Sequence, residues 1–245
     1  MTSTQAAQAP RPARSTRARR GAARQPPSPD EIHERIVSAI FEHRLAPGTK
    51  LGEDRLAEIF GVNRSRIRAV LARLAHEQLV RLEPNRGAFV AAPTVEEARE
   101  IFESRRLLEP GIVRRLVGTI DREGVRQLRA LVRREAHARA SNDRHSVIRL
   151  SGEFHLLMAE LAGNRFLAKS MRELTSLTCL IIFLYDSPSI PSCHGDEHVQ
   201  IVEAISEGSA DRAVSLMLHH LDHVQASLAL HEEHANRIEL EQVFA

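Results

Sequence analysis

The chain of 245 residues is 42% hydrophobic and 27% charged, a composition typical of soluble globular proteins, and it is long enough for two domains. Aromatic residues make up only 4% and Trp is absent, which argues against nucleic-acid binding by base stacking. The longest strongly apolar stretch, residues 177–185, is far shorter than the roughly 20 residues that span a bilayer, and the N-terminus lacks the apolar core of a secretory signal. The two cysteines, Cys179 and Cys193, form no metal-type pair and make a weak case for a disulfide. We therefore expect a cytoplasmic protein with no membrane partner.

Charge is distributed unevenly along the chain, although the net charge is only +2. Residues 1–29 contain six arginines and no acidic residue, whereas residues 93–245 carry a net charge of −5. Between these parts, the short stretch 64–86 contains six arginines against two glutamates. Positive charge concentrated on a tail and on one short stretch is typical of a protein whose N-terminal part binds nucleic acid.

Residues 1–28 are rich in Ala, Pro, Ser and Arg and contain almost no large apolar side chain. Such a segment cannot bury enough apolar surface to offset its ordering entropy, so it is predicted to be a disordered basic tail. It is either a solvated leader or an arm that adds salt-sensitive, sequence-independent affinity for DNA.

The next part, residues 29–92, has the pattern of a winged helix-turn-helix. Apolar residues at helical spacing predict helices over about 30–42 and 53–60, separated by a turn at Pro47-Gly48. In the second helix, Leu56, Ile59 and Phe60 are expected to face inward. Gly61 ends that helix and Asn63 caps a third helix over 64–76, so a three-residue turn joins two helices.

A β-hairpin is predicted over residues 79–92, directly after the third helix. Leu79, Val80 and Leu82 are expected to face Phe89 and Val90 across a turn that contains Pro84, Asn85 and Gly87. Two strands in this place form the wing.

The helix predicted over 64–76 has two different faces. With about 100° between successive residues, its core face consists of Ile67, Val70, Leu71 and Leu74. The outward face is a strip of small residues, Ser65, Ala69 and Ala72, with Arg64 and Arg68 along one edge and Arg66 and Arg73 along the other. An ordinary solvated face would also carry charges, but small residues let a helix approach DNA closely while arginines reach phosphates or guanine edges.

The remainder, residues 93–245, is predicted to be an antiparallel all-α bundle. Thr94 with Glu97 three positions later forms a capping box that starts its first helix. Pro110-Gly111 is expected to kink or break that helix. Helices are expected over about 94–118, 122–140, 144–162, 165–186, 196–207 and 209–233. The fold class is therefore mainly α, with a winged helix-turn-helix ahead of a helical bundle.

Residues 34–90 resemble the winged helix-turn-helix of GntR-family regulators, with LAPGTKL (45–51), GVNRSRIRAVLARL (61–74) and NRGAFV (85–90) at the family's characteristic segments. The resemblance implies that Arg64 and Arg68 contact bases or phosphates and that the wing tip, Arg86-Gly87, enters the minor groove. It also implies that Asn63, Ser65 and Arg66 set the phosphate register. Two positions depart from the family pattern: Gly52, where a Ser or Asn cap is common, and Arg66, where a small residue is common.

Residues 97–229 resemble the all-α effector domain of FadR-like regulators (the FCD type), on the segments 101–110, 150–167, 196–214 and 218–224. Many relatives bind a divalent metal there through an Asp and three His. These positions correspond to Ser151, His155, His198 and His220, so a Zn²⁺ or Ni²⁺ site is implied, although Ser151 removes one strong oxygen ligand. A metal-free pocket lined by the same histidines is the alternative. Arg105 is implied to point into the pocket, where it would suit a carboxylate effector.

The sequence thus predicts a DNA-binding regulator that is not an enzyme. We expect it to act as a repressor and a homodimer, on a short palindromic operator of double-stranded DNA, under the control of an organic acid. Two alternatives from other classes are a hydrolase that uses His155, His198 and His220 with Glu197 as general base, and a sequence-independent architectural DNA binder.

Overall fold

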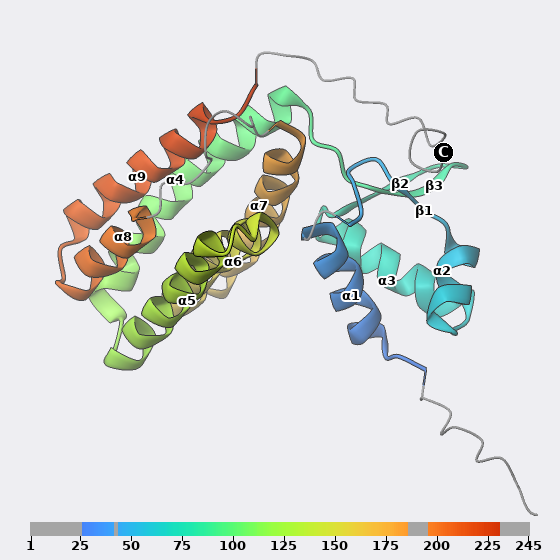
Figure 1. The fold of residues 1–245 in the computed structure, drawn as a ribbon, viewed down its shortest axis with the longest axis horizontal. Coiled ribbons are helices and arrows are strands. Elements are labelled where there is room, and N and C mark those ends of the chain that lie inside the picture. The colour runs from blue at the N-terminus through green and yellow to red at the C-terminus, as the bar shows by residue number, and fades with distance from the viewer. Residues whose placement is uncertain (1–25, 42–43, 186–195, 231–245) are drawn as a thin grey trace, which may run out of the picture.

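The computed structural model describes residues 26–41, 44–185 and 196–230. These residues form two lobes, an N-terminal lobe with a small sheet and a larger helical lobe (Figure 1). The predicted basic tail lies outside the described residues except for residues 26–28. In the described part of the chain, no helix combines the length and the hydropathy of a transmembrane span.

The N-terminal lobe contains three helices and three strands among its described residues. Its first helix begins with a capping box that the sequence analysis did not identify. The Ser28 amide donates to Glu31 Oε2 at 2.7 Å, and the Glu31 amide donates to Ser28 Oγ at 3.1 Å. The elements are α1 (Pro29–Phe41), β1 (Lys50–Leu51), α2 (Glu53–Phe60), α3 (Arg64–His76), β2 (Val80–Glu83) and β3 (Gly87–Val90).

The wing is a three-stranded antiparallel sheet in the order β1-β3-β2, so the predicted two-stranded hairpin was incomplete. The third strand, β1, is only two residues long, too short for any periodicity to be recognised. It follows the predicted turn, where Gly48 has a φ of +80° and donates its amide to the Val90 carbonyl at 2.9 Å. The chain therefore returns along β3 directly after this turn.

Two inward-facing assignments in this lobe were wrong. Leu82 pairs with Ala88 and shares the sheet face of the buried residues Val80 and Val90, but it lies on the edge strand β2 next to the wing turn and is 53% exposed. Ile59 is 57% exposed, because only one side of the short helix α2 packs against α3. The predicted core face of α3 is confirmed: all four of its residues are buried, namely Ile67, Val70, Leu71 and Leu74.

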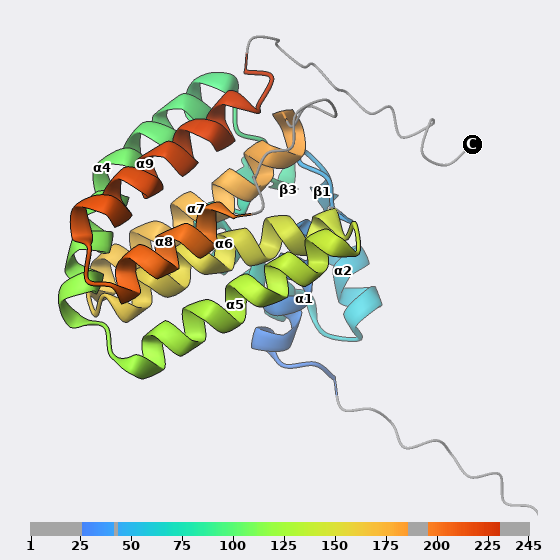
Figure 2. The same ribbon diagram turned by 60° about the vertical axis from the view of Figure 1, so that its left-hand side comes forward.

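The helical lobe is an antiparallel bundle, as predicted. In Figure 2, α4 and α9 lie side by side, and α5, α6 and α7 form a second group. The predicted Thr94–Glu97 capping box starts α4. The elements are α4 (Val95–Thr119), α5 (Arg122–Ala140), α6 (Arg144–Leu161), α7 (Arg165–Tyr185), α8 (Glu197–Ser206) and α9 (Ala210–Ala226).

Two helix boundaries differ from the prediction. α4 continues through Pro110 instead of breaking there, because packing against α6, α7, α8 and α9 outweighs the one backbone hydrogen bond that proline lacks. The last helix ends at Ala226 and not near residue 233, and its final predicted residues lie outside the described part of the chain.

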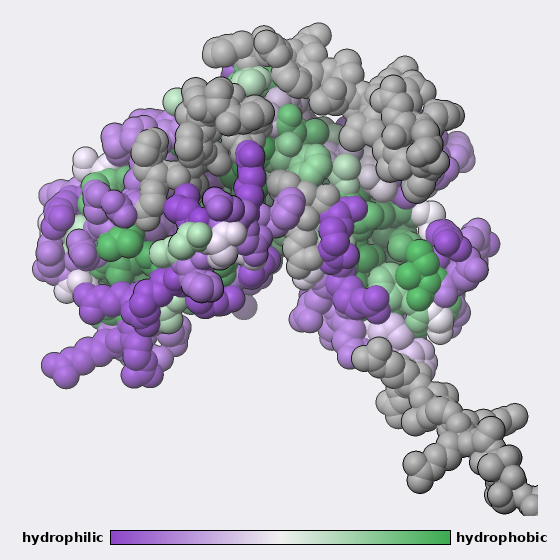
Figure 3. Space-filling model, viewed as in Figure 1, coloured by the Kyte–Doolittle hydropathy of each residue, from purple (hydrophilic) through white to green (hydrophobic). Residues whose placement is uncertain are grey.

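The two lobes share apolar contacts at their junction. Leu180 of α7 belongs to the core of the N-terminal lobe, and the Tyr185 hydroxyl donates to the Pro93 carbonyl at 3.0 Å. Figure 3 shows a hydrophilic outer surface over the helical lobe, more hydrophobic surface toward the junction, and a hollow between the lobes. The short link at residues 91–94 is therefore backed by side-chain packing.

Candidate DNA-binding face and buried histidine centre

The start of α3 is fixed by the predicted cap. Asn63 Oδ1 accepts a hydrogen bond from the Arg66 amide at 2.9 Å. The strip predicted to face DNA is exposed along its whole length, at Ser65, Ala69 and Ala72. α3 therefore presents small residues to solvent, which is the surface that a major-groove helix needs.

The first arginine edge of α3 is paired with the start of α2. Arg68 binds Glu53 through two hydrogen bonds of 3.0 and 2.8 Å, and Arg64 Nε lies 3.0 Å from Asp54 Oδ1. These side chains remain open to water, with Arg64 59% and Arg68 66% exposed. The hydrogen bonds from Arg68 lower the pKa of Glu53, which stays ionised at neutral pH. Exposed pairs of this kind exchange partners at little cost, so both arginines can still reach DNA.

The second arginine edge, Arg66 and Arg73, is bound to residues around the start of α1 and at the end of α3. Arg66 Nη1 donates to the Pro27 carbonyl at 3.2 Å, and Arg73 forms ion pairs with Asp30 at 2.7 Å and Glu77 at 3.2 Å. Arg66 thus contacts the segment that leads from the N-terminal tail into α1. Its predicted role in phosphate binding stays a prediction.

The tip of the wing has the shape that its sequence predicts. Asn85 has a φ of +62° and Gly87 a φ of +99°, and the Arg86 amide donates to the Glu83 carbonyl at 3.1 Å. The exposed Arg86 side chain forms an ion pair with Glu83, and its guanidinium lies 5.4 Å from the centre of the Phe89 ring. The tip therefore presents one cation that can enter a minor groove.

The three histidines predicted as metal ligands meet inside the helical lobe. His155 comes from α6, His198 from α8 and His220 from α9, and each is at most 4% exposed. The Nε2 atom of His220 lies 3.2 Å from that of His155 and 3.3 Å from that of His198. The fold therefore brings together the three histidines that the family resemblance implied as ligands.

Each of these histidines also binds a carboxylate through its other ring nitrogen. The Nδ1 atom is 2.6 Å from Glu109 at His155, 2.7 Å from Glu135 at His198 and 2.7 Å from Glu197 at His220. An ionised carboxylate accepts only, so Nδ1 must carry a proton, and in a neutral ring Nε2 then presents a lone pair. Three lone pairs that point toward one another repel unless a cation lies between them.

The carboxylates are themselves bound through their second oxygen. Glu109 accepts from Arg105 at 2.6 Å, Glu135 accepts from Arg139 at 2.9 Å, and Glu197 pairs with His223. Glu109 and Glu135 were not predicted from the sequence, although each lies four residues from its arginine on one helix, which is a recognisable pattern. Glu197, considered above as a general base, uses both oxygens to bind histidines and so acts to orient them.

Burial sets the protonation of this centre. Desolvation lowers the pKa of His155 to about 3 and that of His220 to about 4, so both rings are neutral at neutral pH. Burial raises the pKa of Glu109, but the positive charge of Arg105 and the contact with His155 outweigh it and lower the pKa to about 2. Neutral imidazoles backed by ionised carboxylates are the form in which histidine binds metals.

The donor set fits a divalent transition metal. In a tetrahedral zinc site with Zn–N bonds of about 2.0–2.1 Å, the nitrogens lie about 3.3–3.4 Å apart. The Nε2 atom of His220 lies at nearly this distance, 3.2 and 3.3 Å, from the Nε2 atoms of the other two histidines. Three imidazoles, each with an acceptor on its outer nitrogen, are therefore arranged as ligands.

Ser151 lies one helical turn before His155 on α6 and is 8% exposed. The neighbouring Gly152 lets α6 and α7 pack closely, since a Cβ atom there would lie 3.0 Å from Thr175 Cγ2 and 3.2 Å from Cys179 Sγ. Ser151 itself lies inside the bundle, where its hydroxyl is a weaker oxygen ligand than the aspartate that the family resemblance implies.

Arg105 is buried and already paired with side chains of the helical lobe, and its predicted role in effector binding stays a prediction. It is 2% exposed, and it binds Glu109 and, at 3.3 Å, the Thr178 hydroxyl, so a carboxylate of the chain itself already occupies part of its guanidinium. Its Nη2 atom is buried and has no hydrogen-bond partner among the described residues. This nitrogen therefore has both of its N–H groups available to a further acceptor.

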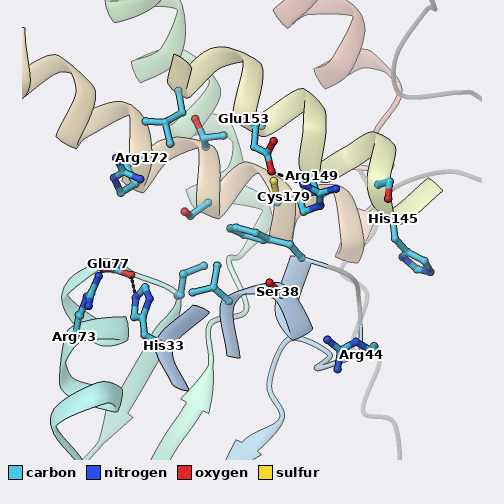
Figure 4. A pocket seen from close by; sticks show the side chains of 18 of the residues that line it. His33, Ser38, Arg44, Arg73, Glu77, His145, Arg149, Glu153, Arg172 and Cys179 are labelled. Atoms are coloured by element: carbon cyan, nitrogen blue, oxygen red, sulfur yellow. Dashed lines mark hydrogen bonds and ion pairs between the residues drawn. The ribbon is translucent and has the colours of Figure 1, made fainter. Parts of the chain in front are cut away.

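A cleft of about 840 Å³ lies between the two lobes (Figure 4). On the N-terminal side it is lined by His33 and Glu77, whose side chains are 2.5 Å apart. On the helical side it is lined by Arg149 and Glu153 of α6, also 2.5 Å apart. These α6 residues lie on a different face of the helix from His155. α6 therefore contacts both the histidine centre and the cleft.

Family models match both lobes of the chain. The model described as "FCD domain" matches residues 100–223, and the model described as "Bacterial regulatory proteins, gntR family" matches residues 29–90. Together they cover the winged helix-turn-helix and the helical bundle, in agreement with the two resemblances noted in the sequence.

Curated relatives and solved structures agree with these matches. The HTH-type transcriptional repressor RspR of Escherichia coli (strain K12) is 23% identical over 203 residues, which are 82% of this chain and 89% of RspR. The gluconate operon transcriptional repressor of Bacillus subtilis (strain 168) is 41% identical over 87 residues, 36% of this chain and 34% of the repressor. A GntR transcriptional regulator structure from Rhodococcus sp. RHA1 has a TM-score of 0.71 at 24% identity, and the match covers 81% of this chain and 95% of that chain. The structural likeness supports the same fold.

Proposed function

The chain belongs to the gntR family of bacterial regulatory proteins and carries an FCD domain, and from this premise we propose how it regulates transcription. It represses genes by binding a short palindromic operator as a homodimer, and a small organic acid in the helical lobe controls that binding. A single α3 covers only one half-site, so a two-fold symmetric pair is needed for a palindrome. The protein acts in the cytoplasm, where its DNA lies.

The observation that carries the DNA-binding proposal is the exposed strip on α3 beside an exposed arginine edge. Ser65, Ala69 and Ala72 allow close approach, and Arg64 and Arg68 stand along one side of them. In the major groove, these guanidinium groups would bind guanine O6 and N7 or nearby phosphates. Asn63, Ser65, Arg66, Arg86 and Gly87 would hold the register on the backbone and in the minor groove.

The DNA proposal is tested by selecting fragments of genomic DNA with the full chain and measuring their affinity against a scrambled fragment of equal length. A regulator should bind the selected site about 10³-fold or more tightly than the scrambled DNA at physiological salt. A ratio near one would instead identify a sequence-independent architectural protein. Sedimentation of the complex then shows whether two chains occupy one operator.

The histidine centre is proposed to hold a divalent ion such as Zn²⁺ or Ni²⁺ through Nε2 of His155, His198 and His220. Support comes from the convergence of three lone pairs and from the carboxylate behind each ring. The ion would tie three helices together and offer an open position to an oxygen ligand. In the family pattern, Ser151 stands at the position of the residue that supplies an oxygen ligand to the ion.

Metal binding is tested on protein purified without a His-tag and treated with a chelator. Adding Zn²⁺ should raise the melting temperature, since an ion at 100 times its dissociation constant contributes about 2.7 kcal/mol. His198→Ala should lose the part of this increase that comes from the buried ion, while His137→Ala, at an exposed position on α5, should keep the whole increase. A wild-type protein that neither retains nor takes up metal would contradict the proposal.

The effector is proposed to signal through α6. A carboxylate that reaches the ion and Arg105 Nη2 would shift His155, and α6 would carry the shift to Arg149 and Glu153 in the cleft against α1 and α3. The two sites would thus share one rigid element. A screen of organic acids should find at least one that changes operator affinity. No change across the screen would count against this switch.

A further inference from the structure

A second group of possible metal ligands lies at the surface, next to the histidine centre. His219 and His223 are one helical turn apart on α9, and Glu197 faces them from the first turn of α8. One ligand atom from each of these three residues lies within 4.8 Å of the others. The ring centres of His219 and His223 are 3.9 Å apart. The group therefore has the compactness of a three-ligand site before any ion is added.

The chemistry of this group differs from that of the buried centre. Two imidazoles and one carboxylate form a donor set that binds Zn²⁺ in proteins, and two His at i and i+4 can reach the same ion from one helix face. His219 is exposed and the His223 side chain is 39% exposed, so water could complete the coordination. Such a site would exchange its ion more readily than the buried one.

Glu197 belongs to both groups. Its Oε2 atom lies 2.7 Å from Nδ1 of His220 in the buried centre, and its Oε1 atom binds Nδ1 of His223. An ion bound between Oε1 and the two surface histidines would replace the His223 contact and leave the His220 contact in place. The same carboxylate would then ligate one ion and orient a ligand of the other.

We propose that Glu197, His219 and His223 form a second, surface site for a divalent transition-metal ion, separate from the buried three-histidine centre. The family assignment is not needed for this site, which rests on the geometry of α8 and α9. The full chain would bind two ions, one buried and one exposed, with Glu197 between them.

The experiment is a Zn²⁺ titration of the full, untagged chain by calorimetry after metal removal. The wild type is expected to bind two ions per chain and His219→Ala only one, with the surface ion weakened about 100-fold or more. His198→Ala should lose the buried ion and keep the surface ion. His137→Ala, at an exposed position on α5, is the control and should bind as the wild type does.

Glu197→Gln tests the shared carboxylate. It should remove the surface ion and weaken the buried ion by about 10- to 100-fold, the usual effect of losing an outer partner of a metal-bound histidine. Circular dichroism before each titration confirms that the variants are folded. If His219→Ala or Glu197→Gln does not fold, His223→Gln takes its place, and it should lose the surface ion and keep the buried ion at its wild-type affinity.

Two results would overturn the proposal. One is an equal stoichiometry and affinity in the wild type and His219→Ala. The other is a His198→Ala protein that binds no ion, because the surface site should survive the loss of the buried one. If the wild type binds one ion and His198→Ala still binds one that His219→Ala lacks, the surface site stands and only the buried site fails.

Discussion

The DNA-binding face and the histidine centre use similar charged pairs in opposite surroundings. Arg68 and Glu53 are paired at the surface, with side chains 66% and 28% exposed, whereas Arg105 and Glu109 are each 2% exposed. A surface pair gains little and can be exchanged for a phosphate. A buried pair must stay together, because separating it leaves an unpaired charge in an interior that water does not reach. The first arrangement suits reversible binding to DNA, and the second suits a fixed internal frame.

The largest expected effect comes from breaking the buried frame. Glu109→Ala should lower the free energy of unfolding by about 3–5 kcal/mol, since it leaves Arg105 without its carboxylate and His155 without its acceptor. Urea unfolding in the presence of a chelator measures this change. The matched surface variant is Glu160→Ala, which removes the partner of Arg172 in the same lobe and should cost about 1 kcal/mol or less. Equal losses in the two variants would erase the contrast between buried and surface pairs.

The next effect concerns the face that contacts DNA. Arg64→Ala and Arg68→Ala should each weaken binding to the selected operator about 5- to 150-fold, the cost of losing a bidentate contact. Their thermal unfolding should change little, because both side chains are exposed. Arg55→Ala, a surface arginine of α2 paired with Glu58, is the control and should bind DNA normally. Unchanged affinity in both α3 variants would refute the assignment of α3 as the recognition helix.

The DNA-binding lobe was largely predictable because its signals are local. The cap at Asn63, the spacing of Ile67 and Leu71, and the turn around Asn85 each depend on a few neighbouring residues. β1 was missed because two residues show no period. Leu82 was expected to be buried, but it lies at the sheet edge beside the wing turn, beyond the core that covers Val80 and Val90 on the same face. Short elements obtain their place from tertiary contacts, which a local pattern does not contain.

In the histidine centre, the three histidines could be predicted from the sequence, but the carboxylates behind them could not. Spacing and the family resemblance placed His155, His198 and His220 together, and the structure agrees. Glu109 and Glu135 were missed because they come from α4 and α5, and the sequence does not give the rotation of one helix against another. Arg105 was expected to point into the pocket, and its pairing with Glu109 on the same helix was not predicted.

A moderate effect is expected from the helix cap. Asn63→Ala should destabilise the first turn of α3 by about 1 kcal/mol, because the Arg66 amide loses its acceptor. Hydrogen exchange of the first α3 amides should become faster by about fivefold, while the amides of α6 should be unaffected. Asn63→Asp retains the acceptor and should restore protection. Faster exchange in both lobes would show that the two lobes unfold as one unit.

The smallest expected effect tests whether the surface pairs restrain the DNA-binding arginines. Glu53→Gln removes the charge that pairs with Arg68 and Arg64, so it should tighten DNA binding by up to about fivefold at low salt, with the gain shrinking as salt is added. Glu58→Gln makes the same charge change on α2 but releases only Arg55, so it reports the effect of net charge alone. Fluorescence anisotropy on the operator compares the two variants. If both variants tighten DNA binding equally, the gain comes from net charge alone. The ion pairs of Glu53 then do not restrain Arg64 and Arg68, and these arginines are as available to DNA with their carboxylate partners as without them.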